Sequence, residues 1–224
     1  MPFRWLCMHG GEMNSTMFKI QLAPLMVALQ AEHDCEFVFL NATFPVEHSR
    51  VPDADCYPGG YFVWVPLSED TNRDKLKQCH QYIRHNIDKR GPIDGIIAYS
   101  QGSSIVCDML VREMVEKVDI LGPLRCCVFF SGYCPPPVWG PDAGHDNAPA
   151  RLSPKSLPDP IAVPSLHVLG SEDFTRSVAL EMKELFEEDS ARLLEFEGDH
   201  WIPSDLAWVM QIKNELKALM CYGE

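Results

Sequence analysis

Short apolar runs alternate with longer segments whose apolar residues recur at helical spacing. The runs predict buried strands at residues 3–8, 35–40, 93–99, 125–131, 165–169 and 192–196. The helical spacing predicts helices after a cap at Asn14 or Ser15 and after Thr71, and further helices over about 101–118, 177–188 and 203–220. Residues 41–61, rich in Pro, Asp and Gly, and residues 133–163, with eight prolines, are predicted as loops.

This order of elements predicts an α/β fold with a mostly parallel, doubly wound sheet flanked by helices. The strands are short and apolar throughout, which is typical of parallel strands covered on both faces. Right-handed crossovers then place functional residues at the carboxyl ends of the strands. No linker-like stretch divides the chain, so we expect one domain over residues 1–224, with residues 133–163 as a lid-like insertion.

Charge and hydropathy exclude several classes of partner. The formal net charge is −13, and a surface of that sign disfavours nucleic acid and anionic membranes. No apolar run approaches the roughly 18 residues of a membrane span. The N-terminus lacks the features of a signal peptide, so a cytosolic location is expected.

The nine cysteines are interpreted as free thiols. Their number is odd, their positions are scattered, and none has zinc-ligand spacing with a second Cys or a His. We therefore expect no metal and no cofactor.

The clearest motif is Ile-Ile-Ala-Tyr-Ser-Gln-Gly at residues 96–102. A strand, a sharp turn at Ser100 and a helix match the nucleophile elbow, usually written G-x-S-x-G. Small residues must flank the nucleophile because strand and helix approach closely there. Ala98 and Gly102 meet that need, although Ala98 replaces the usual Gly. An ordinary strand-to-helix turn with a chance serine is the alternative.

A serine hydroxyl needs a base, and His200 lies on the loop between the last strand and the last helix. Asp173 follows the preceding strand and can orient that imidazole, which places Ser100, Asp173 and His200 in the chain order of α/β-hydrolases. Glu172 competes with Asp173 for this role. A solvated loop histidine and a turn-capping aspartate are the alternatives.

Backbone N–H groups of Gly11 and Gln101 are the expected oxyanion donors, one from the turn after the first strand and one from the residue after the nucleophile. A plain turn is the alternative for Gly11. The proline-rich span is expected to line an acyl pocket with Tyr133, Val138 and Trp139, although an ordered surface loop explains it nearly as well.

The sequence resembles the FSH family (family of serine hydrolases) of the α/β-hydrolase superfamily over nearly the whole chain. The resemblance rests on LCMHG at residues 6–10, YFVW at 61–64, YSQGS at 99–103, HVLG at 167–170 with Asp173, and GDHWIP at 198–203. Two departures are Ala98 and the sequence EDFT at 172–175, which lacks the family's Asp-x-Val-Val-Pro-like run.

The resemblance implies a triad at Ser100, Asp173 and His200 that hydrolyses acyl esters or thioesters. The sequence is also similar to stand-alone thioesterases that release polyketides from fungal synthases. This similarity implies a role in secondary metabolism, with an acyl carrier protein or a synthase as partner. A non-catalytic binding protein and a small-peptide serine peptidase are the alternatives.

Overall fold

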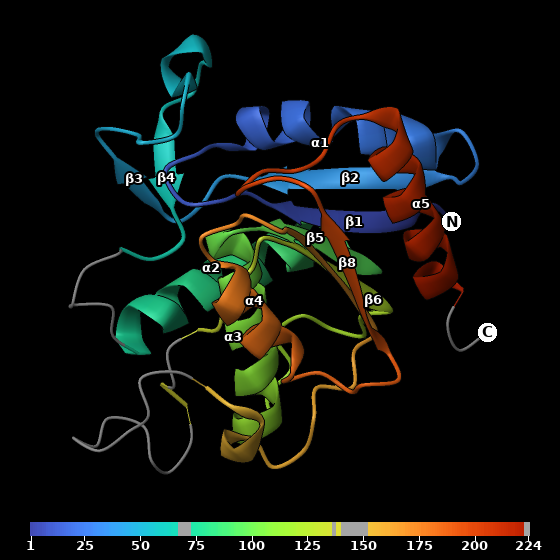
Figure 1. Cartoon of the computed structure of the whole chain (residues 1–224). Coiled ribbons are helices and arrows are strands. Elements are labelled where there is room, and N and C mark those ends of the chain that lie inside the picture. The colour runs from blue at the N-terminus through green and yellow to red at the C-terminus, as the bar shows by residue number, and fades with distance from the viewer. Residues whose placement is uncertain (67–72, 136–137, 140–151, 222–224) are drawn as a thin grey trace.

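A six-stranded parallel sheet forms the centre of the protein in the computed structural model, which describes all residues except 67–72, 136–137, 140–151 and 222–224 (Figure 1). Every neighbouring pair of strands runs parallel, as the apolar runs predict. The strand order is β2-β1-β5-β6-β7-β8. The strands are β1 (Phe3–Met8), β2 (Cys35–Leu40), β5 (Gly95–Tyr99), β6 (Cys126–Phe130), β7 (Ser165–Gly170) and β8 (Ala191–Phe196).

Helices cover both faces of this sheet. The helices are α1 (Ser15–Gln30), α2 (Arg73–Arg90), α3 (Gln101–Glu116), α4 (Arg176–Lys183) and α5 (Leu206–Met220). Figure 1 shows α1 and α5 on one face and α2, α3 and α4 on the other. Successive strand residues point to opposite faces of the sheet. Trp5 packs in the core between the sheet and helices α1 and α5, and Leu6 packs in the core between the sheet and helices α2 and α3. Among the described residues, no helix combines the length and the hydropathy needed to cross a membrane.

The stretch at residues 41–61, predicted as loop, instead contributes to a small antiparallel arm. Its strands are β3 (Phe44–Val46) and β4 (Tyr61–Val63), and a 3-10 turn, η1 (Ala54–Cys56), lies between them. Three-residue strands are too short to show a period, which is why the sequence pattern does not reveal them. The arm projects beside the main body (Figure 1).

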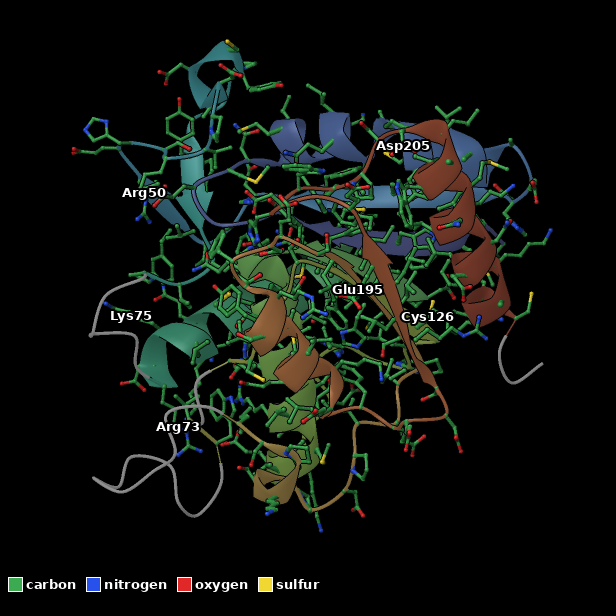
Figure 2. All side chains as sticks on the ribbon, viewed as in Figure 1. Arg50, Arg73, Lys75, Cys126, Glu195 and Asp205 are labelled. Carbon is green, nitrogen blue, oxygen red and sulfur yellow. The ribbon has the colours of Figure 1, made fainter. Side chains whose placement is uncertain are left out.

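Two helix ends also differ from the prediction. Helix α5 begins at Leu206 rather than at Pro203, because the side chain of Asp205 accepts a hydrogen bond from Trp208 N and caps the helix (Figure 2). Helix α4 ends at Lys183 instead of about residue 188, because the following backbone pairs with Ile161.

The winding of the sheet changes direction between β1 and β5, where crevices for ligands form in such folds. At this point α3 begins directly over the end of β1. A Cβ atom on Gly102 would lie 2.5 Å from the carbonyl oxygen of Met8, so only glycine fits there. The chain therefore brings the turns after β1 and β5 into contact.

Two of the three buried histidines among the described residues lie on or at the end of a strand of this sheet. His167 on β7 is 2% exposed, and its ring centroid lies 5.1 Å from those of Phe129 and Phe186. His9, at the end of β1, is fully buried. Burial lowers the pKa of His167 to about 3 and that of His9 to about 4.

We predict that acidification destabilises the protein through these two histidines. Their pKa values in the folded protein lie below the ordinary value of 6.5. Between pH 6.5 and these lower values, the unfolded chain therefore binds more protons than the folded protein does. The free energy of unfolding should be unaffected by them above pH 6.5 and should fall as the pH is lowered, by up to about 1.4 kcal/mol per histidine for each pH unit. Urea unfolding between pH 7 and pH 5 measures this slope.

His167→Leu should reduce that slope by about one histidine's share. Phe186→Leu is the matched control, since it alters the same part of the core without removing a titrating group. An equal slope in His167→Leu and in the unmodified protein would contradict the assignment.

Candidate active site

Ser100 occupies the sharp turn between β5 and α3. Its backbone has φ 50° and ψ −116°, a left-handed conformation that costs energy for a residue with a Cβ, and its N–H donates to Phe130 O at 2.9 Å. Ala98 is fully buried and pairs in register with Met8 and Phe129, so its methyl group is accommodated in the sheet. The geometry is that of a nucleophile elbow.

His200 lies on the loop between β8 and α5 and faces Ser100. Its Nε2 is 2.9 Å from Ser100 Oγ. Two hydrogen bonds fix its backbone: Tyr99 Oη donates to His200 O at 2.8 Å, and His200 N donates to Asp199 Oδ1 at 2.7 Å. Asp199 therefore positions the backbone of His200 and not its ring.

The loop that carries His200 packs directly on the turn after β7. A Cβ atom on Gly170 would lie 2.2 Å from Gly198 O, so this approach requires glycine. Glu172 N donates to Gly198 O at 2.8 Å and joins the two loops. Any side chain at position 170 would separate the loops that bear Asp173 and His200.

Asp173, and not the exposed Glu172, contacts the imidazole. Its Oδ1 and Oδ2 lie 2.9 Å and 3.1 Å from His200 Nδ1. Burial by itself would raise the pKa of Asp173, but the hydrogen bonds from His200 and Thr175 outweigh it and the pKa is lowered to about 2. The carboxylate is therefore ionised at neutral pH.

These contacts determine the tautomer of His200. An ionised Asp173 can only accept, so Nδ1 of the imidazole carries the proton. In the neutral imidazole Nε2 then carries no proton and can accept a hydrogen bond from the Ser100 hydroxyl, 2.9 Å away. This is the arrangement that general-base activation of a serine requires.

Gly11 and Gln101 lie side by side at the start of α3. A Cβ atom on Gly11 would be 3.4 Å from Gln101 Oε1. The first N–H groups of a helix have no carbonyl one turn earlier to bond with, so Gln101 N has no acceptor within α3. The Gln101 side chain is held by the two residues that follow the arm, accepting from Trp64 N and donating to Val65 O at 2.8 Å each.

The arm also holds the turn after β1. His9 Nε2 accepts from Ala42 N at 3.0 Å, and its carbonyl accepts from Trp64 Nε1 at 2.7 Å. Glu12, which has φ 59°, forms a two-oxygen ion pair with Arg50, labelled beside the arm in Figure 2. The conformation of residues 9–12 thus depends on residues that follow β2.

The residues expected to line an acyl pocket are placed differently from one another. Tyr133 is half-buried, and burial raises its pKa to about 12. Val138 packs against the α2–α3 core. Trp139 is 6% exposed, and its Nε1 donates to Asp108 Oδ1 at 2.8 Å, two helical turns beyond Ser100. Trp139 therefore offers a substrate little surface; much of the proline-rich span, residues 136–137 and 140–151, lies outside the described residues.

Trp139 belongs to a buried polar cluster between α2 and α3. His80 Nε2 lies 2.9 Å from Asp108 Oδ2, and the Arg112 guanidinium lies 4.8 Å from the Trp139 ring centroid. Arg112 Nη1 donates to His80 Nδ1 at 3.1 Å. This second His–Asp pair has no serine beside it in the contacts described and serves to join the two helices.

Sequence reasoning missed Thr175, Tyr99 and Phe174. Thr175 N and Oγ1 each donate to Asp173 Oδ1 at 2.7 Å. Asp side chains commonly bond the backbone N–H two residues on, and this tendency could have indicated position 175. The described residues contain no cluster of three or more His, Cys, Asp or Glu side chains arranged to hold a metal ion.

Comparisons with known proteins agree on the family. Residues 1–212 match the family described as "Serine hydrolase (FSH1)". The chain is 29% identical over 222 residues to Esterase FUS5 of Gibberella moniliformis, covering 94% of this chain and 84% of that protein. It is 26% identical over 245 residues to the dihydromonacolin L thioesterase of the lovastatin nonaketide synthase from Aspergillus terreus, with 97% and 92% covered.

A solved structure supports the fold. The crystal structure of esterase PE8 superposes with a TM-score of 0.59 at 16% identity, covering 96% of this chain and 92% of that chain. At that identity the likeness concerns the fold alone, which is the α/β-hydrolase fold. The match over residues 1–212 goes further, and with it the chain belongs to the FSH1 family of serine hydrolases.

Proposed function

We propose that this protein cleaves acyl thioesters or carboxylic esters through an acyl-enzyme on Ser100. The observation that carries the proposal is the hydrogen-bonded line from Asp173 through His200 to Ser100, with 2.9 Å at each junction. Family membership agrees with this chemistry. Ser100 acts as the nucleophile, His200 as the base and Asp173 as the group that orients the base.

Acylation begins when the Ser100 oxygen attacks the substrate carbonyl carbon. His200 Nε2 takes the hydroxyl proton as the new C–O bond forms, and Asp173 stabilises the imidazolium that results. The carbonyl oxygen becomes negatively charged and accepts hydrogen bonds from the N–H groups of Gly11 and Gln101. His200 then donates its proton to the departing oxygen or sulfur, which leaves the acyl group on Ser100.

Deacylation repeats these steps with water in place of the serine. His200 Nε2 takes a proton from a water molecule, whose oxygen attacks the acyl carbon. The C–O bond to Ser100 breaks, and the serine oxygen recovers its proton from His200. The products are a carboxylic acid and the regenerated enzyme, so every proton is returned.

The substrate we propose is a small acyl ester or thioester, with an acyl carrier protein or a synthase as the donor in secondary metabolism. The support is similarity to a thioesterase whose name refers to a polyketide synthase. Tyr133 and Val138 remain candidates for lining the acyl pocket, and the single domain over residues 1–224 and the cytosolic location remain predictions.

Removal of the nucleophile tests the proposal. Ser100→Ala should lower the hydrolysis of an activated acyl ester by roughly 10⁴-fold or more, because the base then has no hydroxyl to activate. Ser171→Ala, an exposed serine near the site, is the control and should retain activity. Turnover in Ser100→Ala equal to that of the unmodified protein would rule out the mechanism.

A fluorophosphonate probe separates the proposal from its alternatives. We expect a covalent adduct on Ser100 and none in Ser100→Ala, which an inert binding protein would not give. Rates on a thioester, an ester and an amide with the same acyl group should then rank the amide last. A preference for the amide would identify a peptidase instead.

The choice of acid is tested by paired substitutions. Asp173→Asn should lower kcat by roughly 10²–10⁴-fold, because an amide can donate to Nδ1 and favour the wrong tautomer of His200. Glu172→Gln changes the neighbouring carboxylate in the same way and should leave kcat within about twofold. Equal losses in the two variants would contradict the assignment to Asp173.

Thr175 is proposed as a positioning residue for that carboxylate. Thr175→Val removes the hydroxyl that donates to Asp173 Oδ1 and should lower kcat by about tenfold with little change in KM, because a hydrogen bond to a charged group is lost. Thr175→Ser keeps the hydroxyl and should restore most of kcat. A Thr175→Ser variant as slow as Thr175→Val would indicate that the methyl group matters and not the hydroxyl.

A further inference from the structure

Phe174 presents an apolar ring to solvent beside His200. It is 78% exposed, whereas its neighbours Asp173 and Thr175 are 5% and 8% exposed. Single exposed apolar residues are common on proteins, so exposure alone decides nothing. The position of this ring is what matters: its centroid lies 4.7 Å from that of the His200 imidazole, with 39° between the two planes.

Hydrogen bonds fix the backbone on both sides of Phe174. Asp173 N donates to Gly170 O at 3.2 Å, and Arg176 N donates to Asp173 O at 2.9 Å. Thr175 N donates to the Asp173 side chain at 2.7 Å. A substrate group that contacts Phe174 therefore meets a backbone that is already ordered, which avoids part of the entropy cost of binding.

The chemistry of His200 indicates which part of the substrate lies there. His200 Nε2, 2.9 Å from Ser100 Oγ, is the atom that protonates the departing oxygen or sulfur. The leaving group must therefore pass beside the imidazole against which Phe174 packs. The carbonyl oxygen, in contrast, is directed toward Gly11 and Gln101.

We infer that Phe174 is a specificity-determining contact for the leaving group, and that it favours alcohols or thiols with an apolar body. This inference rests on the proposed function and adds the class of leaving group to it. The ring would also keep water away from one side of the imidazole while the alcohol or thiol is still attached. Aromatic rings supply large apolar contact area without needing to move.

Acetate esters of ethanol and hexanol provide the test, because the acyl group is constant and the two alcohols have similar acidity. The unmodified protein should show a higher kcat/KM for hexyl acetate than for ethyl acetate. Phe174→Ala should reduce this hexyl-to-ethyl ratio by about tenfold, and Phe174→Leu by less. A ratio unchanged in Phe174→Ala would overturn the inference.

The deacylation rate distinguishes substrate contact from a structural effect on His200. All acetate esters give the same acetyl-enzyme, and the alcohol has left by then, so a leaving-group contact cannot affect this step. After a burst with p-nitrophenyl acetate, Phe174→Ala should deacylate within about twofold of the unmodified rate. Deacylation slowed as much as acylation would show that Phe174 acts through the imidazole, and it would overturn the inference.

Val27→Ala is the matched control, because Val27 on α1 is 69% exposed and distant in the chain from Ser100, Asp173 and His200. It should leave the ratio unchanged. The two proposals fail in different ways. Adduct formation at Ser100 with an unaltered ratio in Phe174→Ala would remove the inference and leave the proposed function intact. Failure of the unmodified protein to react with any ester or with the fluorophosphonate would remove both.

Discussion

Close approach of backbone to backbone at the carboxyl edge of the sheet is the constraint on which the site depends. Gly102 lets the start of α3 lie against the end of β1, where a Cβ atom would come within 2.5 Å of a carbonyl oxygen. Gly170 does the same for the loops after β7 and β8, at 2.2 Å. Because these approaches tolerate no side chain, the turns that carry Ser100, Asp173 and His200 have essentially one arrangement. The strained backbone of Ser100 is maintained by the same packing.

The charge state of each buried group at the site depends on the hydrogen bonds that the group accepts. Asp173 is buried, yet the hydrogen bonds it accepts outweigh the cost of burial and bring its pKa to about 2. His9 is buried too, but its contacts are with neutral backbone groups, and its pKa falls to about 4. The carboxylate therefore stays charged and the structural imidazole stays neutral. The Asp173 carboxylate thus places a negative charge against the His200 imidazole, and the neutral His9 in the turn after β1 adds no charge of its own.

Segments outside the main sheet complete the site. Residues that flank the arm of β3 and β4 hold the Gln101 side chain and the turn after β1, so the expected oxyanion donors depend on residues 42–65 as well as on α3. Phe174 extends from the same short turn that carries the acid. One tetrapeptide, residues 172–175, thereby includes the ion that orients His200, the hydroxyl that supports that ion, and the ring that we assign to the leaving group.

The order of strands and helices, the parallel sheet, and the positions of Ser100, Asp173 and His200 at strand ends could all be predicted from the sequence, because apolar periodicity and glycine placement are local properties. The arm could not, since strands of three residues show no period. The burial of Trp139 could not be predicted either. Its hydrogen-bond partner Asp108 lies 31 positions away on α3, and the residue pattern of that helix does not indicate a contact with Trp139. The choice between Asp173 and Glu172 likewise needed the tertiary structure. Adjacent carboxylates are equivalent in a sequence, and only the path of the backbone past Gly198 decides which one faces the imidazole.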